Sequence, residues 1–379
     1  MQSKLMSLAI AAAFALGAGT ASAQTTIRIG HVGPLTGNGA HLGKDNEAGA
    51  RMAIDELNAK KLRIGGQEVR FELLSEDDAA DPKQGTAAAT KLVDAKVAGV
   101  IGHLNSGTSI PASRVYSDAG IPQISPSSTA PKYTQQGFKT TFRVVANDGQ
   151  LGGTLGRYAV NELKAKAIVV IDDRSAYGQG VADEFAKGVQ AAGGKVLTRE
   201  YTNDKATDFN AILTKIKARK PDLIFFGGMD AVGGPMLRQM KQLGIDARFM
   251  GGDGVCTGEM PRLAGDALGD GKVVCAEAGG VEGDGVKAME EFNARFKQKF
   301  NMDVKLYAPY VYDALNTMVA AMQKADSADP KKYLPELGKI TYQGVTGTIA
   351  FDDKGDIRNG ALTLYTFRNG QREQMRVVR

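Results

Sequence analysis

Two groups of polar side chains at the ends of predicted strands could together bind a zwitterion. Ser106, Ser127 and Thr129 lie in two loops that lead into helices in the first half of the chain. Their hydroxyls, with the free backbone N–H groups of helix starts, suit an anion such as a carboxylate. Asp253 follows a strand in the second half and could pair with an ammonium group. If the two groups face each other across a cleft, they predict an α-amino acid as the ligand.

Each of these residues also has an ordinary structural interpretation. Ser106 and Thr129 could simply cap helices, because serine and threonine are preferred at that position. Asp253 lies between glycines in the run Gly251-Gly252-Asp253-Gly254 and could be a turn residue. The residues alone leave both interpretations open.

The elements that would position these side chains alternate between strand and helix. In the first half, the pattern of branched and apolar residues predicts strands at 26–32, 69–74, 98–103 and 121–124, with helices between them. This order is typical of a parallel sheet covered by helices on both faces. Ligands of such sheets bind beyond the carboxyl ends of the strands, where the loops described above lie.

The second half repeats this order. Strands are predicted at 167–172, 195–200, 222–226 and 248–250, and landmark glycine and isoleucine residues recur roughly 123 to 135 residues after their counterparts. The chain is therefore expected to form two lobes of one α/β architecture. The remaining helices at 286–300 and 310–324 and strands at 346–351 and 361–367 are expected to complete the two sheets, which requires several crossovers and hence a hinge.

The first residues predict export. Lys4 precedes the apolar run 5–17, and Ala21-Ser22-Ala23 matches the small-residue pattern of a signal-peptide cleavage site, which predicts residues 1–23 as a signal peptide cleaved after Ala23. The apolar run is shorter than the ~20 residues of a transmembrane helix. The two cysteines, Cys256 and Cys275, favour a disulfide in an oxidising compartment, with two separate buried thiols as the alternative.

Composition and motifs argue against several classes of function. A formal charge of +5 over 379 residues, without a basic block, does not favour nucleic-acid binding. The two cysteines and three scattered histidines lack metal-ligand spacing, so neither a metal nor another cofactor is expected. Gly37, Gly39 and Gly43 resemble a dinucleotide fingerprint, but the last spacing is one residue too long. No motif of a hydrolase elbow or zinc protease is present, and an enzyme is not predicted.

Several motifs resemble one known family. The runs GHLNSGTSIPAS (102–113), ISPSSTAPKYT (124–134), DDRSAYGQG (172–180) and FMGGDG (249–254) are similar to those of the periplasmic Leu/Ile/Val-binding proteins, as are IGHVGPLTG (29–37) and DDAADPKQ (77–84). The resemblance covers the whole mature chain in order. It implies the type I periplasmic-binding fold, in which two doubly wound parallel-sheet lobes are joined by three crossovers and close on a ligand.

The resemblance also implies a function and its partners. Such a protein captures an amino acid, here expected to be aliphatic or branched-chain, in the periplasm and delivers it to the permease of an ABC transporter. A monomer is expected. The alternative is an exported binding protein or sensor of the same fold for amides, urea or aromatic acids, although Asp253 favours a ligand with a cationic amine.

The resemblance assigns roles to individual residues. Ser106 and Thr129 fall where the family holds the α-carboxylate, Ser127 where a backbone carbonyl accepts from the ammonium, and Asp253 where an acidic residue neutralises the ammonium. The ligand side chain would contact a wall made of Leu42, Leu104, Asn105, Ser128, Tyr177, Met229 and Tyr307. One lobe is expected to comprise residues 24-145 and 278-358, and the other residues 146-277 and 359-379.

Three departures from the family pattern bear on these roles. Asn105 and Ala80 replace a cysteine pair found in some members, so any disulfide here is Cys256–Cys275. Leu42 and Met229 stand where some members have aromatic residues, and Asp253 is one methylene shorter than the glutamate that is common there. These changes affect the expected side-chain preference rather than the amino-acid class.

Overall fold

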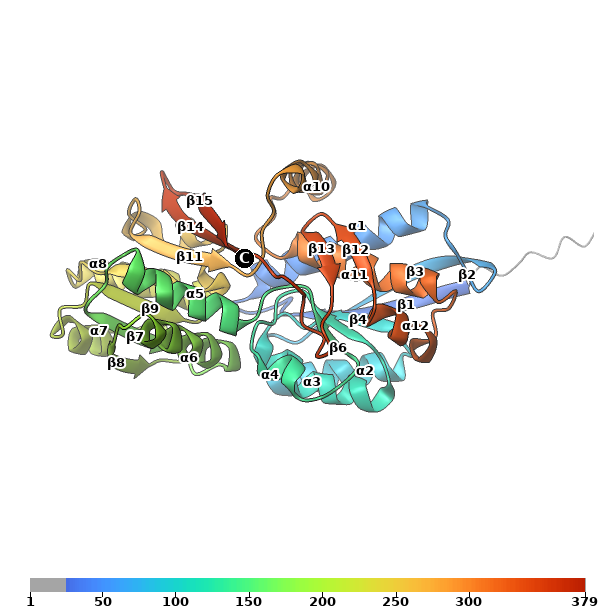
Figure 1. The fold of residues 1–379 in the computed structure, drawn as a ribbon, viewed down its shortest axis with the longest axis horizontal. Helices are drawn as coiled ribbons and strands as arrows, with labels where there is room; N and C mark the ends of the chain where they lie inside the picture. Colours follow the sequence, from blue (N-terminus) through green and yellow to red (C-terminus); the bar gives the residue numbers. More distant parts are fainter. Residues whose placement is uncertain (1–24, 379) are drawn as a thin grey trace, which may run out of the picture.

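The computed structural model describes residues 25–378, which form two α/β lobes side by side along the long axis of the molecule (Figure 1). The predicted signal peptide lies outside these described residues. Across residues 25–378, none of the helices has the length and apolar character that crossing a membrane requires.

The first lobe is built on a six-stranded sheet with the order β2-β3-β1-β4-β5-β6. Its strands are β1 (Thr25–Gly33), β2 (Arg63–Ile64), β3 (Gln67–Asp77), β4 (Gly99–Gly102), β5 (Gln123–Ser125) and β6 (Thr141–Arg143). Neighbouring strands are parallel except the short edge strand β2, which is antiparallel to β3. The carboxyl ends of β4 and β5, which lead into the predicted site loops, therefore lie next to each other.

Alternating side chains explain why helices cover both faces of this sheet. Ile29 and Ile101 point into the core shared with α1 (Ala40–Ala59) and α11 (Ala308–Lys324). Val32 and Val100 point into the opposite core, against α2 (Pro82–Asp94) and α3 (Ser106–Ala119). Both sides are apolar, as expected for strands buried on two faces.

The second lobe is built on a seven-stranded sheet with the order β15-β14-β11-β10-β9-β7-β8. Its strands are β7 (Ile168–Asp172), β8 (Val196–Tyr201), β9 (Leu223–Gly227), β10 (Arg248–Gly251), β11 (Val273–Glu277), β14 (Leu362–Arg368) and β15 (Gln371–Val378). Strands β7 to β11 are parallel, whereas β14 and β15 add an antiparallel edge.

Helices cover both faces of the second sheet as well. The cores lie on one side against α5 (Asp148–Asn161) and α6 (Ala176–Ala191) and on the other against α7 (Asn210–Lys217) and α8 (Asp230–Gln242). In β9, Phe225 belongs to the first core and Phe226 to the second. The short helices η1 (Asp253–Val255), α9 (Met260–Ala264) and η2 (Gly265–Ala267) follow β10.

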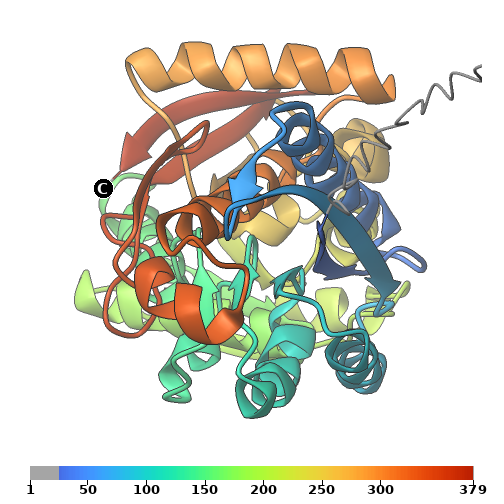
Figure 2. The same ribbon diagram turned by 90° about the vertical axis from the view of Figure 1, so that its right-hand side faces the viewer.

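The chain passes between the lobes three times. It leaves the first sheet after β6, returns after β11 through α10 (Asp284–Phe300) and α11, and leaves again between residues 351 and 362. Helix α10 lies on the outside of the molecule in both views (Figures 1 and 2). Three adjacent connections are consistent with the predicted hinge.

Parts of the predicted arrangement were wrong. The strand at 346–351, expected to complete a sheet of one lobe, instead forms a separate hairpin of β12 (Thr341–Gly344) and β13 (Gly347–Ala350). Asp313 of α11 fixes this hairpin by accepting hydrogen bonds from the backbone of Val345 and Thr346. The sequence analysis also did not predict β6, β11, β15, α4 (Lys132–Gln135), α5 or α12 (Pro330–Leu337).

Cys256 and Cys275 form a disulfide with their Cα atoms 5.3 Å apart. Cys256 follows η1, and Cys275 lies in β11 beside β10. The bond therefore ties the loop that carries Asp253 to the neighbouring strand, and both cysteines are fully buried.

Candidate ligand-binding site

Asp253 lies at the meeting of the two lobes. Its side chain is 1% exposed, and its two carboxylate oxygens accept hydrogen bonds of 2.8 Å from the hydroxyls of Tyr177 and Tyr307. Tyr177 belongs to α6 of the second lobe, whereas Tyr307 precedes α11 of the first lobe. The carboxylate is thus buried between hydroxyl donors from both sides.

Burial shapes the protonation of this cluster. It raises the pKa of Asp253 to about 6, although the hydrogen bonds from Tyr307 and Tyr177 oppose the rise. Burial and the charge of Asp253 raise the pKa of both tyrosines well above the usual value, so their hydroxyls stay protonated as donors. At neutral pH the cluster carries a negative charge that a cationic ligand group could neutralise.

Close backbone packing positions Asp253. A Cβ atom on Gly252 would lie 2.7 Å from the hydroxyl oxygen of Tyr177, and one on Gly254 would lie 2.6 Å from the carbonyl oxygen of Gly228. The backbone N–H of Gly254 also donates to the Tyr177 hydroxyl at 3.0 Å. The glycines on either side of Asp253 are therefore required by the approach of α6 and the loop after β9.

Asp45 positions the tyrosine from the first lobe. This residue of α1 is fully buried and accepts the four consecutive backbone N–H groups of residues 305–308, at 2.8 to 3.2 Å. Those groups include the free N–H groups at the start of α11, which an acidic side chain satisfies well. Tyr307 is held in place by this contact.

The hydroxyl-rich loops after β4 and β5 bond to each other. The hydroxyls of Ser127 and Ser128 donate to the carbonyl of Leu104 at 2.9 and 3.1 Å, and the hydroxyl of Ser106 accepts from the backbone of Ala130. Thr129 is fully buried, and its hydroxyl has no hydrogen-bond partner in the part of the chain that the structure describes. Of these four hydroxyls, that of Thr129 is the one that makes no hydrogen bond between the two loops.

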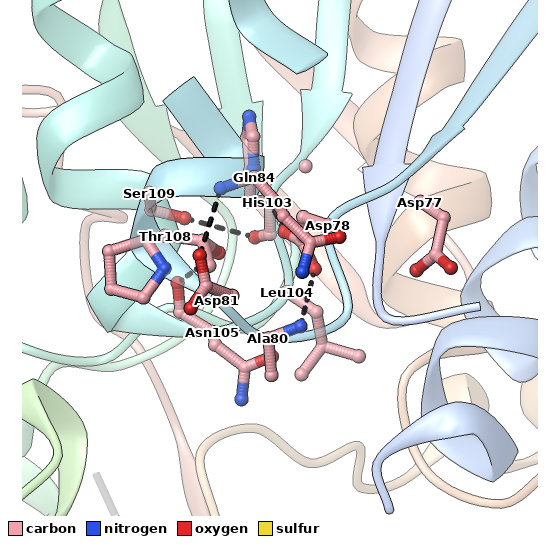
Figure 3. A network of polar contacts seen from close by, with 12 residues as sticks. Asp77, Asp78, Ala80, Asp81, Gln84, His103, Leu104, Asn105, Thr108 and Ser109 are labelled. Carbon is pink, nitrogen blue, oxygen red and sulfur yellow. Dashed lines mark hydrogen bonds and ion pairs between the residues drawn. The ribbon is translucent and has the colours of Figure 1, made fainter. Parts of the chain in front are cut away.

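A buried histidine network lies beneath the first of these loops (Figure 3). The ring of His103 contacts Asp78 and Tyr116, each at 3.0 Å, and all three residues are fully buried. The carbonyl of His103 accepts hydrogen bonds from Ser109 and from Ser125. The network fixes the start of the segment that carries Leu104, Asn105 and Ser106.

Arg143 holds the second loop. Its guanidinium is fully buried and donates to the carbonyls of Ser128 and Ala130 at 2.6 and 3.0 Å. Its Nε donates to Asp356 at 2.6 Å, in the segment where the chain crosses between the lobes for the third time. A planar group with five donors suits this role, because it joins several acceptors in fixed directions.

The predicted side-chain wall is brought together in part. Leu42, Leu104, Tyr177 and Tyr307 belong to one continuous buried cluster, and Met229 packs against it. Ser128 was expected in this wall, but its hydroxyl donates to the carbonyl of Leu104 and bonds to the hydroxyl of Ser109 at 2.6 Å. Asn105 caps the start of α3 with its backbone and leaves its side-chain oxygen without a partner among residues 25–378.

Two charged contacts join the lobes directly. His41 of α1 lies 2.8 Å from Asp230, the first residue of α8, and Lys305 lies 2.6 Å from Glu259. Burial lowers the pKa of His41, but the hydrogen bond and charge of Asp230 outweigh it, and Glu259 adds to their effect. Although the charge of Lys305 opposes the rise, the pKa lies above the ordinary 6.5.

The sequence analysis missed Asp45, Arg143 and the pair His41–Asp230, and it also missed Asp148, a fully buried residue at the start of α5. Arg143 could have been found from the sequence, because it is a lone charged residue in the apolar run TFRVV. A charge buried in such a run is costly unless it has partners. Asp148 follows Asn147, the helix cap of α5, and has the sequence of an ordinary helix start. Within the described residues, no group of three His, Cys, Asp or Glu side chains could hold a metal ion.

A cavity of about 480 Å³ lies elsewhere, at the crossovers. Its lining includes Ala146, Ala278 and Gly360, one residue from each segment that joins the lobes. Neither Asp253 nor Thr129 is among the residues that line this cavity.

Comparison with known proteins agrees with this arrangement. Residues 26–372 match the periplasmic binding protein family. The leucine-, isoleucine-, valine-, threonine- and alanine-binding protein of Pseudomonas aeruginosa is 37% identical over 362 residues, which cover 96% of this chain and 95% of that protein.

Solved structures are similar as well. The leucine-binding protein LivK of Thermotoga maritima has a TM-score of 0.84 at 26% identity, covering 93% of this chain and 98% of that one. LivJ of Streptococcus pneumoniae, a branched-chain amino acid transporter substrate-binding protein in complex with isoleucine, has a TM-score of 0.83 at 27% identity, covering 93% and 99%.

We expect Arg143→Met to weaken ligand binding and stability together. The substitution removes the donors that hold the carbonyls of Ser128 and Ala130 and leaves Asp356 without its cation, at a cost of about 3 kcal/mol. Urea unfolding should show this loss, and calorimetry with L-leucine at least about a tenfold loss of affinity. Arg143→Lys keeps the positive charge but not the several directed donors of the guanidinium. Its stability and affinity should lie between those of the wild type and Arg143→Met. A folded Arg143→Met protein with unchanged affinity would contradict the positioning role.

We also expect affinity to fall with rising pH. Protonated His41 stabilises the contact with Asp230, so this contribution is complete below pH 6.5 and is lost as the pH rises through the raised pKa of His41. Between pH 7 and about pH 8.5, where Asp253 is ionised, calorimetry with L-leucine should show a loss of about three- to tenfold.

His41→Gln should remove this pH dependence. His31→Gln is the matched control, because burial lowers the pKa of His31 to about 4 and it does not titrate in this range. The same pH dependence in wild type and His41→Gln would show that the contact does not contribute to closure.

Proposed function

The chain belongs to the periplasmic binding protein family, and we propose that it captures an aliphatic α-amino acid between its two lobes and delivers it to the permease of an ABC transporter. The observation that carries the proposal is the buried carboxylate of Asp253, whose oxygens face hydroxyls of both lobes. An acidic group in that position suits the ammonium of an amino acid.

In this proposal the first lobe binds the carboxylate of the ligand. Ser106 stands at the start of α3, and Thr129 is buried with a hydroxyl that has no partner among the described residues. Ser127 would contribute its backbone carbonyl to the ammonium. The start of α3 adds the partial positive charge of a helix N-terminus, which favours an anion.

The side-chain class follows from the apolar residues nearby. Leu42 and Leu104 are almost fully buried, and Met229 packs against the same cluster. Such a wall suits Leu, Ile or Val, which are among the ligands in the name of the similar Pseudomonas aeruginosa protein. Asp253 disfavours amides, urea and aromatic acids, because these lack a cationic amine to offset its charge.

The rest of the proposal concerns organisation. The lobes would comprise residues 24-145 with 278-358 and residues 146-277 with 359-379. The protein would be exported by the leader 1–23, would act in the periplasm as a monomer, and would have no catalytic role or cofactor. Closure would follow from a ligand that touches both lobes and so favours the closed form.

We expect Asp253→Asn to weaken L-leucine binding by about 100-fold, or about 3 kcal/mol. The amide keeps the size of the side chain but removes the charge that pairs with the ammonium. The measurement is a thermal-shift panel of the twenty amino acids on the mature chain, followed by calorimetry with the best ligand.

Asp246→Asn is the control, since that carboxylate is fully exposed on the second lobe. It should leave the melting shift unchanged. If Asp253→Asn binds leucine as tightly as wild type, the ammonium assignment is wrong. If no amino acid shifts the melting temperature of the wild type, the proposed ligand class is wrong.

A further inference from the structure

Asp148 is a buried carboxylate that the site described above does not use. It is the first residue of α5, is fully buried, and neither of its carboxylate oxygens has a hydrogen-bond partner among residues 25–378. Its backbone N–H donates to the carbonyl of Thr129 at 2.8 Å, which places it directly against the loop after β5. A buried carboxylate without partners is costly, and such a group in a folded protein needs an explanation.

Its neighbours are the residues of the ligand site. Burial raises the pKa of Asp148 well above its usual value, the negative charge of Asp253 raises it further, and the hydroxyl of Thr129 opposes the rise. The charge of Asp148 also acts on Tyr177. Asp148 therefore interacts electrostatically with both the Thr129 side and the Asp253 side of the site.

The packing around Asp148 also places it near residues of both lobes. Its Oδ2 lies 3.0 Å from where a Cβ atom on Gly180 of α6 would be, and the Cβ of Ala130 lies 3.9 Å from the same point. Ala130 directly follows Thr129 in the first lobe, whereas Gly180 is in the first turn of the helix that carries Tyr177. Glycine at 180 leaves room for the carboxylate.

Two simpler explanations do not account for a carboxyl group buried at this position. Asp148 lies in the first turn of α5, but an interaction with the helix dipole contributes only about 0.3–1 kcal/mol at an exposed site, less than the cost of burying an ion. Arg143 lowers the pKa of Asp148, but its donors are directed to Asp356, Thr134 and two backbone carbonyls. Without a cation bonded to it, the raised pKa favours the neutral carboxyl, and a cationic ligand group would favour the ionised form.

We propose that Asp148 is a second carboxylate of the ligand site, which binds the ligand ammonium together with Asp253. This inference rests on the proposed function, since it assigns a further residue to the same ligand group. A primary ammonium has three N–H donors, so it can satisfy Asp253, Asp148 and one backbone carbonyl at once. Two carboxyl groups also make the site selective, because a ligand without the cation would offer neither of them a positive charge.

The test compares L-leucine with L-2-hydroxy-4-methylpentanoate, which has a hydroxyl in place of the ammonium. We expect Asp148→Asn to weaken leucine binding at least tenfold in calorimetry and to leave hydroxy-acid binding unchanged or tighter. Because the amide replaces a buried ionisable group by a neutral one of the same size, the apo variant should melt at or above the wild-type temperature. Asp148→Ser serves as a second variant should the amide fail to fold.

Asp313→Asn is the matched control, because Asp313 is a buried carboxylate of α11 that bonds to the β12–β13 hairpin. It should keep the wild-type ratio of leucine to hydroxy-acid affinity. The inference is overturned if a folded Asp148 variant binds leucine as the wild type does, or changes both ligands equally. A wild type that binds leucine and responds to Asp253→Asn would then leave the proposed function standing, whereas a wild type that binds no amino acid would overturn both.

Discussion

The burial of Asp253 between the lobes is the constraint on which the rest of the structure depends. An ionised carboxylate removed from water must find donors or a cation, since its desolvation costs several kcal/mol. Here the donors are Tyr177 from one lobe and Tyr307 from the other, each at 2.8 Å. Under the proposed function, closure of the lobes would bring both donors to this carboxylate, and a ligand with a positive charge would favour closure.

The scaffold around Asp253 is made of other buried charges. Asp45 fixes the start of α11 and with it Tyr307, while Arg143 fixes the loop of Thr129 and links it to the third crossover through Asp356. The Asp78–His103–Tyr116 network does the same for the loop of Ser106. Each of these groups is satisfied by several partners, which fixes the site loops of the first lobe in place.

Much of the fold follows from the sequence because its strands are apolar and evenly spaced. Strands β1, β3, β4, β7 and β9 and their helices were predicted from periodicity, as was the repeat of two lobes. Strand β6 was not predicted, since it has only three residues and its centre is followed by Arg143, a polar residue that is buried only because four acceptors surround it. The β12–β13 hairpin depends on Asp313, a contact between residues over thirty positions apart.

The site could be predicted where its residues end strands, and not where tertiary contacts decide. Ser106, Thr129 and Asp253 follow β4, β5 and β10, a position that predicts a role in ligand binding. Asp148 instead begins a helix after Asn147, where an acidic residue is ordinary, and only its burial without partners sets it apart. Similarly, His41 and Asp230 are far apart in sequence and meet only because the lobes do.

The most direct test of this account is a crystal structure of the mature protein grown with L-leucine. The account predicts the ligand between the lobes, with its ammonium nitrogen within about 3 Å of a carboxylate oxygen of Asp253 and its carboxylate at the hydroxyls of Ser106 and Thr129. Leucine bound with its ammonium turned away from Asp253, or bound in the cavity at the crossovers, would contradict it.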